Sequence, residues 1–213
     1  MRYLDNPQGS REWLRDRAGV ITASGFSAVV TKTGKAAGNE RTRKYLAGLA
    51  AERILGEPAG GDQTDWMERG NIMEPRARAW YELEYDVTVQ EVGLCLMDDG
   101  NVGASVDGLV GDDGLIEIKC LDLSNHILAL NGLKSGDHFV QIQGQMLVTG
   151  RAWCDLVFYN PDFPSVAIRM DRDGEWIDKA RIALDQAVAN LEAMTETVRE
   201  VIEAERAVNP FSY

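Results

Sequence analysis

Apolar positions follow two different periods along the 213-residue chain. Steps of three and four residues, typical of helices with one buried face, predict helices over 10–18, 40–55, 66–85, 135–149 and 173–207. Alternation of apolar and polar residues predicts strands over 86–97, 101–110, 114–120, 153–159 and 165–170. This order of elements predicts an α/β fold in which a central mixed β-sheet is flanked by helices.

The segment 105–120 is expected to be the centre of this fold. It predicts two strands joined by a tight turn at 111–114, where glycine and aspartate supply the turn chemistry. Asp107 is expected on the first strand, whereas Glu117 and Lys119 lie two residues apart on one face of the second. Leu115 shares that face, and the opposite face is expected to enter the core through Ile116, Ile118 and Cys120.

Two acids and a lysine that meet beside a sheet have a chemical meaning. Two carboxylates and a backbone carbonyl form an all-oxygen site suited to Mg²⁺ or Mn²⁺. A neighbouring lysine can orient or deprotonate a water molecule, or stabilise a developing negative charge. Such a group suits hydrolysis of a phosphodiester. The alternative is a solvated strand face on which Glu117 and Lys119 form an ordinary ion pair.

Composition limits the class of protein. The chain is 45% hydrophobic, has no apolar run of transmembrane length and begins without a signal-type segment, so we expect a soluble intracellular protein. The three cysteines are widely spaced in apolar contexts and are expected to be reduced core residues. With only two histidines, a histidine-rich metal site is excluded.

The net charge of −12 argues against a surface that coats nucleic acid broadly. Its distribution is uneven, because residues 1–53 contain ten Lys/Arg and five Asp/Glu, whereas the rest contains 12 and 29. A basic first quarter and an acidic body fit a protein that grips a polyanion in one channel and repels it elsewhere. They fit equally a basic segment that pairs with its own acidic body.

Two further positions have both a functional and an ordinary interpretation. Ser24 precedes an apolar segment, where it can bind an anion or simply cap a helix. Glu74 precedes Pro75 within the predicted helix 66–85, and it can reach a metal site or pair with Arg78 one turn away.

Four segments, in order, carry a family resemblance. They are Arg17-Ala18-Gly19-Val20-Ile21-Thr22-Ala23-Ser24, then Gly70-Asn71-Ile72-Met73-Glu74, then Ser105–Leu109 with Leu115–Cys120, and then Gln141-Ile142-Gln143. Through them the chain resembles the lambda exonuclease (YqaJ viral recombinase) family of phage alkaline exonucleases, within the PD-(D/E)xK nuclease superfamily. The resemblance implies a restriction-endonuclease-like core. The superfamily's proline before the catalytic Asp is replaced here by Val106.

The resemblance implies a role for each matching residue. Asp107, Glu117 and the backbone carbonyl of Ile118 would bind metal, with Glu74 near them. Lys119 would position or activate the attacking water. Gln143 would orient Lys119 or that water, with Gln141 as a weaker candidate. Arg17 and Ser24 would hold the 5′-terminal phosphate of the strand that is degraded, together with a DNA contact from Gln141.

The implied activity is a 5′→3′ exonuclease that uses two Mg²⁺ ions, or Mn²⁺, to degrade one strand of linear double-stranded DNA. The implied partners are DNA ends, a phage single-strand annealing protein and two further copies of the chain in a ring-shaped homotrimer. The implied location is the cytoplasm of a bacterial host. The alternatives are an endonuclease or nickase of the same superfamily, a non-catalytic DNA-end-binding protein and an acidic structural protein.

A single domain is expected over 1–213. Within it, residues 1–60 would hold the N-terminal helices and the DNA-end-binding segment, residues 61–170 the catalytic core, and residues 171–213 the C-terminal helix.

Overall fold

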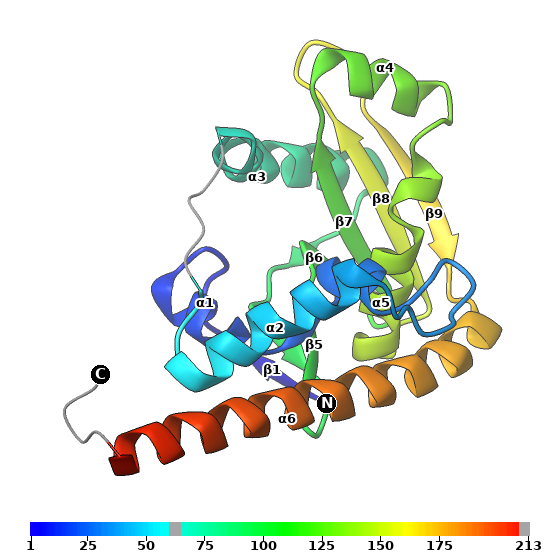
Figure 1. The fold of residues 1–213 in the computed structure, drawn as a ribbon. Helices are drawn as coiled ribbons and strands as arrows, with labels where there is room; N and C mark the ends of the chain where they lie inside the picture. The colour runs from blue at the N-terminus through cyan, green and yellow to red at the C-terminus, as the bar shows by residue number, and fades with distance from the viewer. Residues whose placement is uncertain (60–64, 209–213) are drawn as a thin grey trace.

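The computed structural model describes residues 1–59 and 65–208, with the side chains of 65–71 excepted (Figure 1). The chain forms helices of widely different length: α1 (Arg11–Arg17), α2 (Glu40–Leu55), α3 (Asp65–Tyr85), α4 (Leu123–Leu130), α5 (Phe139–Thr149) and α6 (Gly174–Val208). Two short 3₁₀ helices complete the set, η1 (Ala23–Ala28) and η2 (Ser135–Asp137). The predicted helices are all present, and α3 continues through Pro75.

The strands form two mixed sheets rather than the single sheet expected from the sequence. The first has the order β1-β4-β5-β2, with β1 (Arg2–Leu4), β2 (Ile21–Thr22), β4 (Leu94–Leu96) and β5 (Val102–Ser105). The second has the order β3-β6-β7-β8-β9, with β3 (Val89–Gln90), β6 (Gly108–Val110), β7 (Gly114–Cys120), β8 (Trp153–Tyr159) and β9 (Val166–Asp171). The α/β class is therefore confirmed, and the chain leaves the first sheet for the second at Val106 and Asp107.

Local signals account for several element ends. The Ser10 hydroxyl accepts a hydrogen bond from the Trp13 N–H at 3.1 Å and begins α1, as predicted. The Asn39 side chain begins α2 in the same way. Gly150 ends α5 with a φ of 73°, a left-handed conformation that glycine adopts without strain.

Strand β7 is buried on both faces, which differs from the one buried face expected. It pairs with β6 in antiparallel fashion and with β8 in parallel. Leu115 enters the main core beneath α5 and α6, whereas Ile116 and Ile118 pack against Ala77 and Tyr81 of α3. Helix α3 therefore covers one face of the second sheet and α5 the other (Figure 1). Polar groups on β7 must consequently find partners inside the protein.

Helix α6 begins with a buried apolar stripe, as its sequence predicts. Its inward residues, which include Trp176, Leu184 and Leu191, belong to the main core, and the helix packs along α2. Towards the end of α6 the apolar residues Val198 and Val201 are exposed. The first two thirds of α6 thus support the core below the sheets (Figure 1).

Candidate active site

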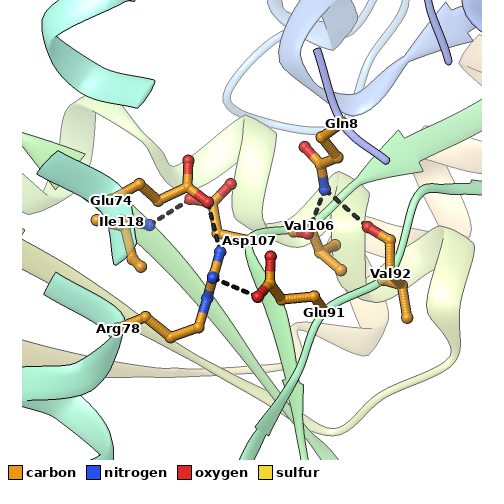
Figure 2. Close-up of polar contacts among 8 residues, drawn as sticks. All are labelled: Gln8, Glu74, Arg78, Glu91, Val92, Val106, Asp107 and Ile118. Atoms are coloured by element: carbon orange, nitrogen blue, oxygen red, sulfur yellow. Dashed lines mark hydrogen bonds and ion pairs between the residues drawn. The ribbon is translucent and has the colours of Figure 1, made fainter. Parts of the chain in front are cut away.

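Asp107 lies at the crossover between the two sheets and not on a strand, which corrects the placement expected from alternation alone. Its Oδ2 accepts a hydrogen bond from the Ile118 N–H at 2.6 Å (Figure 2). Pairing of β6 with β7 ends at Gly108 and Ile116, so the backbone of Ile118 on this side has no strand partner. In an extended strand, the N–H and C=O of one residue point to the same side. The Ile118 carbonyl therefore also faces the side on which Asp107 lies.

Glu117 is held beneath α5 by three donors. Its residue exposure is 2%, and Lys119 Nζ lies 2.5 Å from its Oε1. The Gln141 amide donates to Oε1 and the Gln145 amide to Oε2, each at 2.5 Å. The ion pair of the alternative interpretation is thus formed, but it is buried, so the solvated strand face that was considered is wrong.

Glu74 on α3 makes the helical ion pair that the sequence also allowed. Arg78 Nη2 lies 2.6 Å from Glu74 Oε1, and Arg78 Nη1 lies 2.7 Å from Glu91 Oε1. The carboxyl group of Glu74 nevertheless points towards Asp107 (Figure 2). The ion pair expected of Glu74 is therefore confirmed, and its contribution to a metal site stays a prediction.

The acids perturb one another. Burial raises the pKa of Asp107 well above its usual range, and the nearby charges of Glu117 and Glu74 add to this rise. Burial likewise raises the pKa of Glu74, although Arg78 opposes the rise. Burial alone would lower the pKa of Lys119, but the carboxylates of Glu117 and Asp107 outweigh it and raise that pKa. The site contains more negative charge than its own cations balance.

An open cleft of about 880 Å³ reaches this cluster. Glu74, Arg78, Glu91 and Asp107 line it from one side, and the N-terminal segment lines it from the other with Gln8, Trp13 and several neighbours. The Gln8 amide donates to the carbonyls of Val106 at 2.7 Å and Val92 at 2.9 Å (Figure 2). These bonds fasten the N-terminal segment next to Asp107, so that a molecule in the cleft would reach the acids.

The donor set fits a hard divalent cation. Within residues 1–59 and 72–208, no group of three or more His, Cys, Asp or Glu side chains is already arranged to bind a metal ion. Mg²⁺ does not need one, because it retains several waters and takes one or two protein carboxylates. Asp107, Glu117 and the Ile118 carbonyl would supply the protein oxygens, with Glu74 beside them. An added cation would also offset the charges of Glu117 and Glu74, which add to the effect of burial on the pKa of Asp107.

Arg17 contacts the first sheet at the end of β5, at Ser105, two residues before Asp107. Its guanidinium donates to Ser105 Oγ at 3.0 Å and to Thr22 Oγ1 at 3.4 Å, and it lies over the Trp13 ring. Ser24 does not cap a helix but lies within η1, where its exposed hydroxyl is 3.2 Å from Thr22 Oγ1. Thr22 thus joins the two residues that the sequence singled out for a phosphate.

Gln143 does not reach Lys119, so the contact expected of it is wrong. It is 1% exposed, its amide donates to the Asp171 carbonyl at 2.8 Å, and its Oε1 accepts from the Asp173 N–H at 2.9 Å. Gln143 therefore fastens α5 to the start of α6. Gln141 does enter the cluster, through Glu117.

Sequence reasoning missed Ser105, Gln145 and Thr22. Gln145 could have been found from helical period alone, because it lies four residues after Gln141 and therefore on the same face of α5. Gln143 lies two residues away and faces elsewhere. Thr22 and Ser105 join the site through pairing of β2 with β5, which no local pattern indicates.

The fold and these residues define a mixed α/β protein with a cluster of acids and a lysine around the central strand β7, where its pairing with β6 has ended. Residues 12–152 match the family model of the YqaJ-like viral recombinase domain, and the chain belongs to that family. The family resemblance inferred from the four sequence segments is thereby confirmed. Of Gly70 and Asn71 in the second segment, only the backbone lies within the described part of the chain.

Solved structures agree with this assignment. The chain is 35% identical to an alkaline exonuclease from Laribacter hongkongensis, with a TM-score of 0.81 and coverage of 92% of this chain and 99% of the other. A structure of that exonuclease in complex with dAMP matches equally well. A phage-related exonuclease from Haemophilus somnus shares the fold at 16% identity and a TM-score of 0.66, covering 85% of this chain and 96% of the other.

Two other comparisons are negative. No curated protein matches the chain significantly. None of the helices in the described residues combines the length and apolar character needed to cross a membrane.

Proposed function

We propose that the protein is a Mg²⁺-dependent deoxyribonuclease that degrades one strand of linear double-stranded DNA from its 5′ end and leaves a 3′ single-stranded tail. The observation that carries this proposal is that Asp107, at the wall of an open cleft, lies near the charges of Glu117 and Lys119, which form an ion pair behind it. The 35% identity to an alkaline exonuclease over nearly the whole chain supports the same class of reaction.

The acids would hold the cation through Asp107, Glu117 and the Ile118 carbonyl, with two ions per site implied by the family resemblance. Bound there, Mg²⁺ would lower the pKa of a water molecule and offset charge on the phosphodiester. Gln141 and Gln145 fix the carboxylate of Glu117 from above. Lys119 would orient the attacking water with its N–H donors, since its amine already lies against Glu117.

Arg17, Thr22 and Ser24 would hold the 5′-terminal phosphate. Burial lowers the pKa of Arg17, yet an arginine remains charged at neutral pH and can form two parallel hydrogen bonds to phosphate oxygens. The Ser24 hydroxyl is exposed and available to the same anion. This group would place the first nucleotide between Arg17 and the acids.

The reaction breaks one bond and forms one. A water oxygen attacks the phosphorus that follows the terminal nucleotide, and the bond from that phosphorus to the 3′ oxygen breaks. The 3′ oxygen takes up a proton and leaves with a 5′-mononucleotide. The phosphate stays on the shortened strand, which therefore again ends in a 5′-phosphate that Arg17 can hold.

The acidic net charge is compatible with this function if DNA meets only a restricted basic surface. Arg41, Arg43 and Lys44 on α2 are exposed and available to a duplex. A homotrimeric ring and a single-strand annealing partner follow from the family resemblance and stay predictions. Light scattering after gel filtration should give a mass three times the 23.5 kDa of the chain.

Digestion of two DNA forms tests the proposal. The purified protein is incubated with Mg²⁺ and either linear 5′-phosphorylated duplex or covalently closed circular plasmid. Loss of the linear form alone, with release of mononucleotides, is the expected result. Cutting of the circle would instead indicate the endonuclease or nickase alternative. Binding of DNA ends without turnover would indicate a non-catalytic end-binding protein. A protein that neither binds nor digests DNA would contradict any DNA function.

A further inference from the structure

Gln145 on α5 connects the two sheets through a single amide group. It is 0% exposed, and its Nε2 donates to Glu117 Oε2 at 2.5 Å and to the Ser105 carbonyl at 3.3 Å. Carboxylate and carbonyl oxygens accept hydrogen bonds, so the amide must present its nitrogen to both. The NH₂ group therefore bridges β7 of the second sheet and the end of β5 in the first.

Ser105 extends this connection to the proposed phosphate site. Its carbonyl receives the Gln145 amide, and its hydroxyl accepts from Arg17 at 3.0 Å. A continuous series of contacts thus runs from Arg17 through Ser105 and Gln145 to Glu117. One end of the series would hold the 5′-phosphate and the other end would hold the cation.

Burial of the Gln145 amide destabilises the protein unless the hydrogen bonds that it donates compensate. Its Oε1 is buried and has no hydrogen-bond partner among the described residues. A buried acceptor without a partner destabilises a protein, and an apolar side chain of similar length would avoid that loss. The two donated bonds therefore explain the glutamine.

We infer that Gln145 is a positioning residue that sets the spacing between Arg17 and Glu117, and through it determines which phosphodiester bond lies at the cation site. This inference rests on the proposed function. One nucleotide separates a 5′-terminal phosphate from the first phosphodiester. The distance between Arg17 and Glu117 therefore decides whether that first bond or a later one lies at the cation site. A misplacement of about 1 Å at a reacting bond can lower the rate on the order of 100-fold.

The test compares Gln145→Met with Gln143→Met. Both glutamines are buried on α5 and each amide binds neighbouring groups, but Gln143 contacts only the backbone near the start of α6. Each protein digests duplexes with 5′-phosphate or 5′-hydroxyl ends, and kcat and KM are measured separately together with product length.

Gln145→Met should lower kcat on phosphorylated ends by roughly 10-fold to 100-fold, towards the value for hydroxyl ends. KM should change little, because Arg17 remains, and dinucleotides should appear among the products. Gln143→Met should retain the wild-type ratio of kcat between the two ends and release mononucleotides, even if its melting temperature falls.

Two results would overturn the inference: an unchanged kcat ratio in Gln145→Met, or an equal loss in Gln143→Met. If Gln145→Met does not fold, Gln145→Asn replaces it, because the shorter side chain keeps the amide but cannot span both acceptors. Wild-type protein that digests neither duplex would instead overturn the proposed function, and this inference with it.

Discussion

Two aspartates close to the same sheet have opposite electrostatic surroundings. Asp155 on β8 is 3% exposed, and its carboxylate accepts from Arg169 Nε at 2.9 Å, from Arg169 Nη2 at 2.8 Å and from the Tyr81 hydroxyl at 2.6 Å. The guanidinium of Arg169 also stacks on Trp153, at 3.6 Å from the ring centre. The protein thus supplies Asp155 with its own cation and its own hydroxyl donor.

Asp107 is surrounded differently. It accepts a hydrogen bond from the backbone N–H of Ile118, and burial raises its pKa, with the nearby charges of Glu117 and Glu74 adding to the rise. Arg78 is shared between Glu74 and Glu91, and Lys119 lies against Glu117. The same protein therefore neutralises one buried acid with its own cation and leaves the cluster around Asp107 short of positive charge. Under the proposed function, a divalent cation from outside the chain would supply that charge.

Replacement of Asp107, whose charge no side-chain cation in the described part of the chain balances directly, should have the largest effect on activity. Asp107→Asn keeps an acceptor for the Ile118 N–H but removes a ligand charge. Loss of several kcal/mol of metal-assisted stabilisation corresponds to a fall in rate of roughly 1,000-fold or more. Release of acid-soluble nucleotides from linear duplex measures it, with circular dichroism to show that the fold is intact. Near-wild-type digestion would remove Asp107 from the site.

Replacement of Asp155, whose charge Arg169 balances, should lower stability and leave activity unchanged. Asp155→Asn should lower the free energy of unfolding by roughly 1–3 kcal/mol, because it weakens charge-assisted bonds to Tyr81 and Arg169. Arg169 is half-exposed, with 52% of its side chain accessible, and water can solvate it, which limits the loss. Urea unfolding measures the stability. The digestion rate per folded molecule should be unchanged, and a loss as large as that of Asp107→Asn would erase the contrast between the two acids.

Arg17→Ala should have an intermediate effect that depends on the DNA end. Loss of a charge-assisted contact to phosphate of about 1.5–3 kcal/mol should reduce the preference for 5′-phosphate over 5′-hydroxyl ends roughly 10-fold or more. Competition between the two duplexes in one reaction measures this preference directly. Lys32→Ala, in the exposed loop before α2, is a matched loss of one N-terminal cation that should leave the preference intact.

The smallest effect should be on stability without divalent ions. The pKa of Asp107 is higher in the folded protein than in the unfolded chain. At pH values between these two pKa values, the native state therefore binds more protons than the unfolded state. The free energy of unfolding should therefore fall as pH rises through this window. In EDTA, Asp107→Asn should make the free energy of unfolding depend less on pH. At the upper end of this pH window the variant should melt a few degrees higher than wild type, roughly 2–4 °C for each kcal/mol gained. An identical slope in the variant would show that Asp107 is not perturbed.

Much of the fold could be predicted because its elements carry strong local signals. Helix α2 has the bounds that its periodicity predicts, and strands β7 and β8 begin and end where their apolar runs do. The division into two sheets was not predictable in this way. It depends on pairing of β1 with β4 and of β2 with β5, between segments about 80 to 90 residues apart. Asp107 was misplaced for that reason, since alternation continues through the crossover.

The site shows the same limit. The acids and the lysine could be predicted, because β-strand alternation and the hairpin bring them together locally. The choice among the glutamines of α5 failed because it followed family resemblance alone. The helical period places Gln141 and Gln145 together and Gln143 on another face, as the structure shows.

The proposed function requires that Asp107, Glu117 and the Ile118 carbonyl bind a divalent cation. Crystals soaked in Mn²⁺ and measured for anomalous scattering test it most directly. The prediction is a peak about 2.0–2.3 Å from oxygens of all three groups, absent from crystals of Asp107→Asn. A Mn²⁺ ion bound elsewhere on the chain, with this cluster empty at saturating concentration, would contradict it.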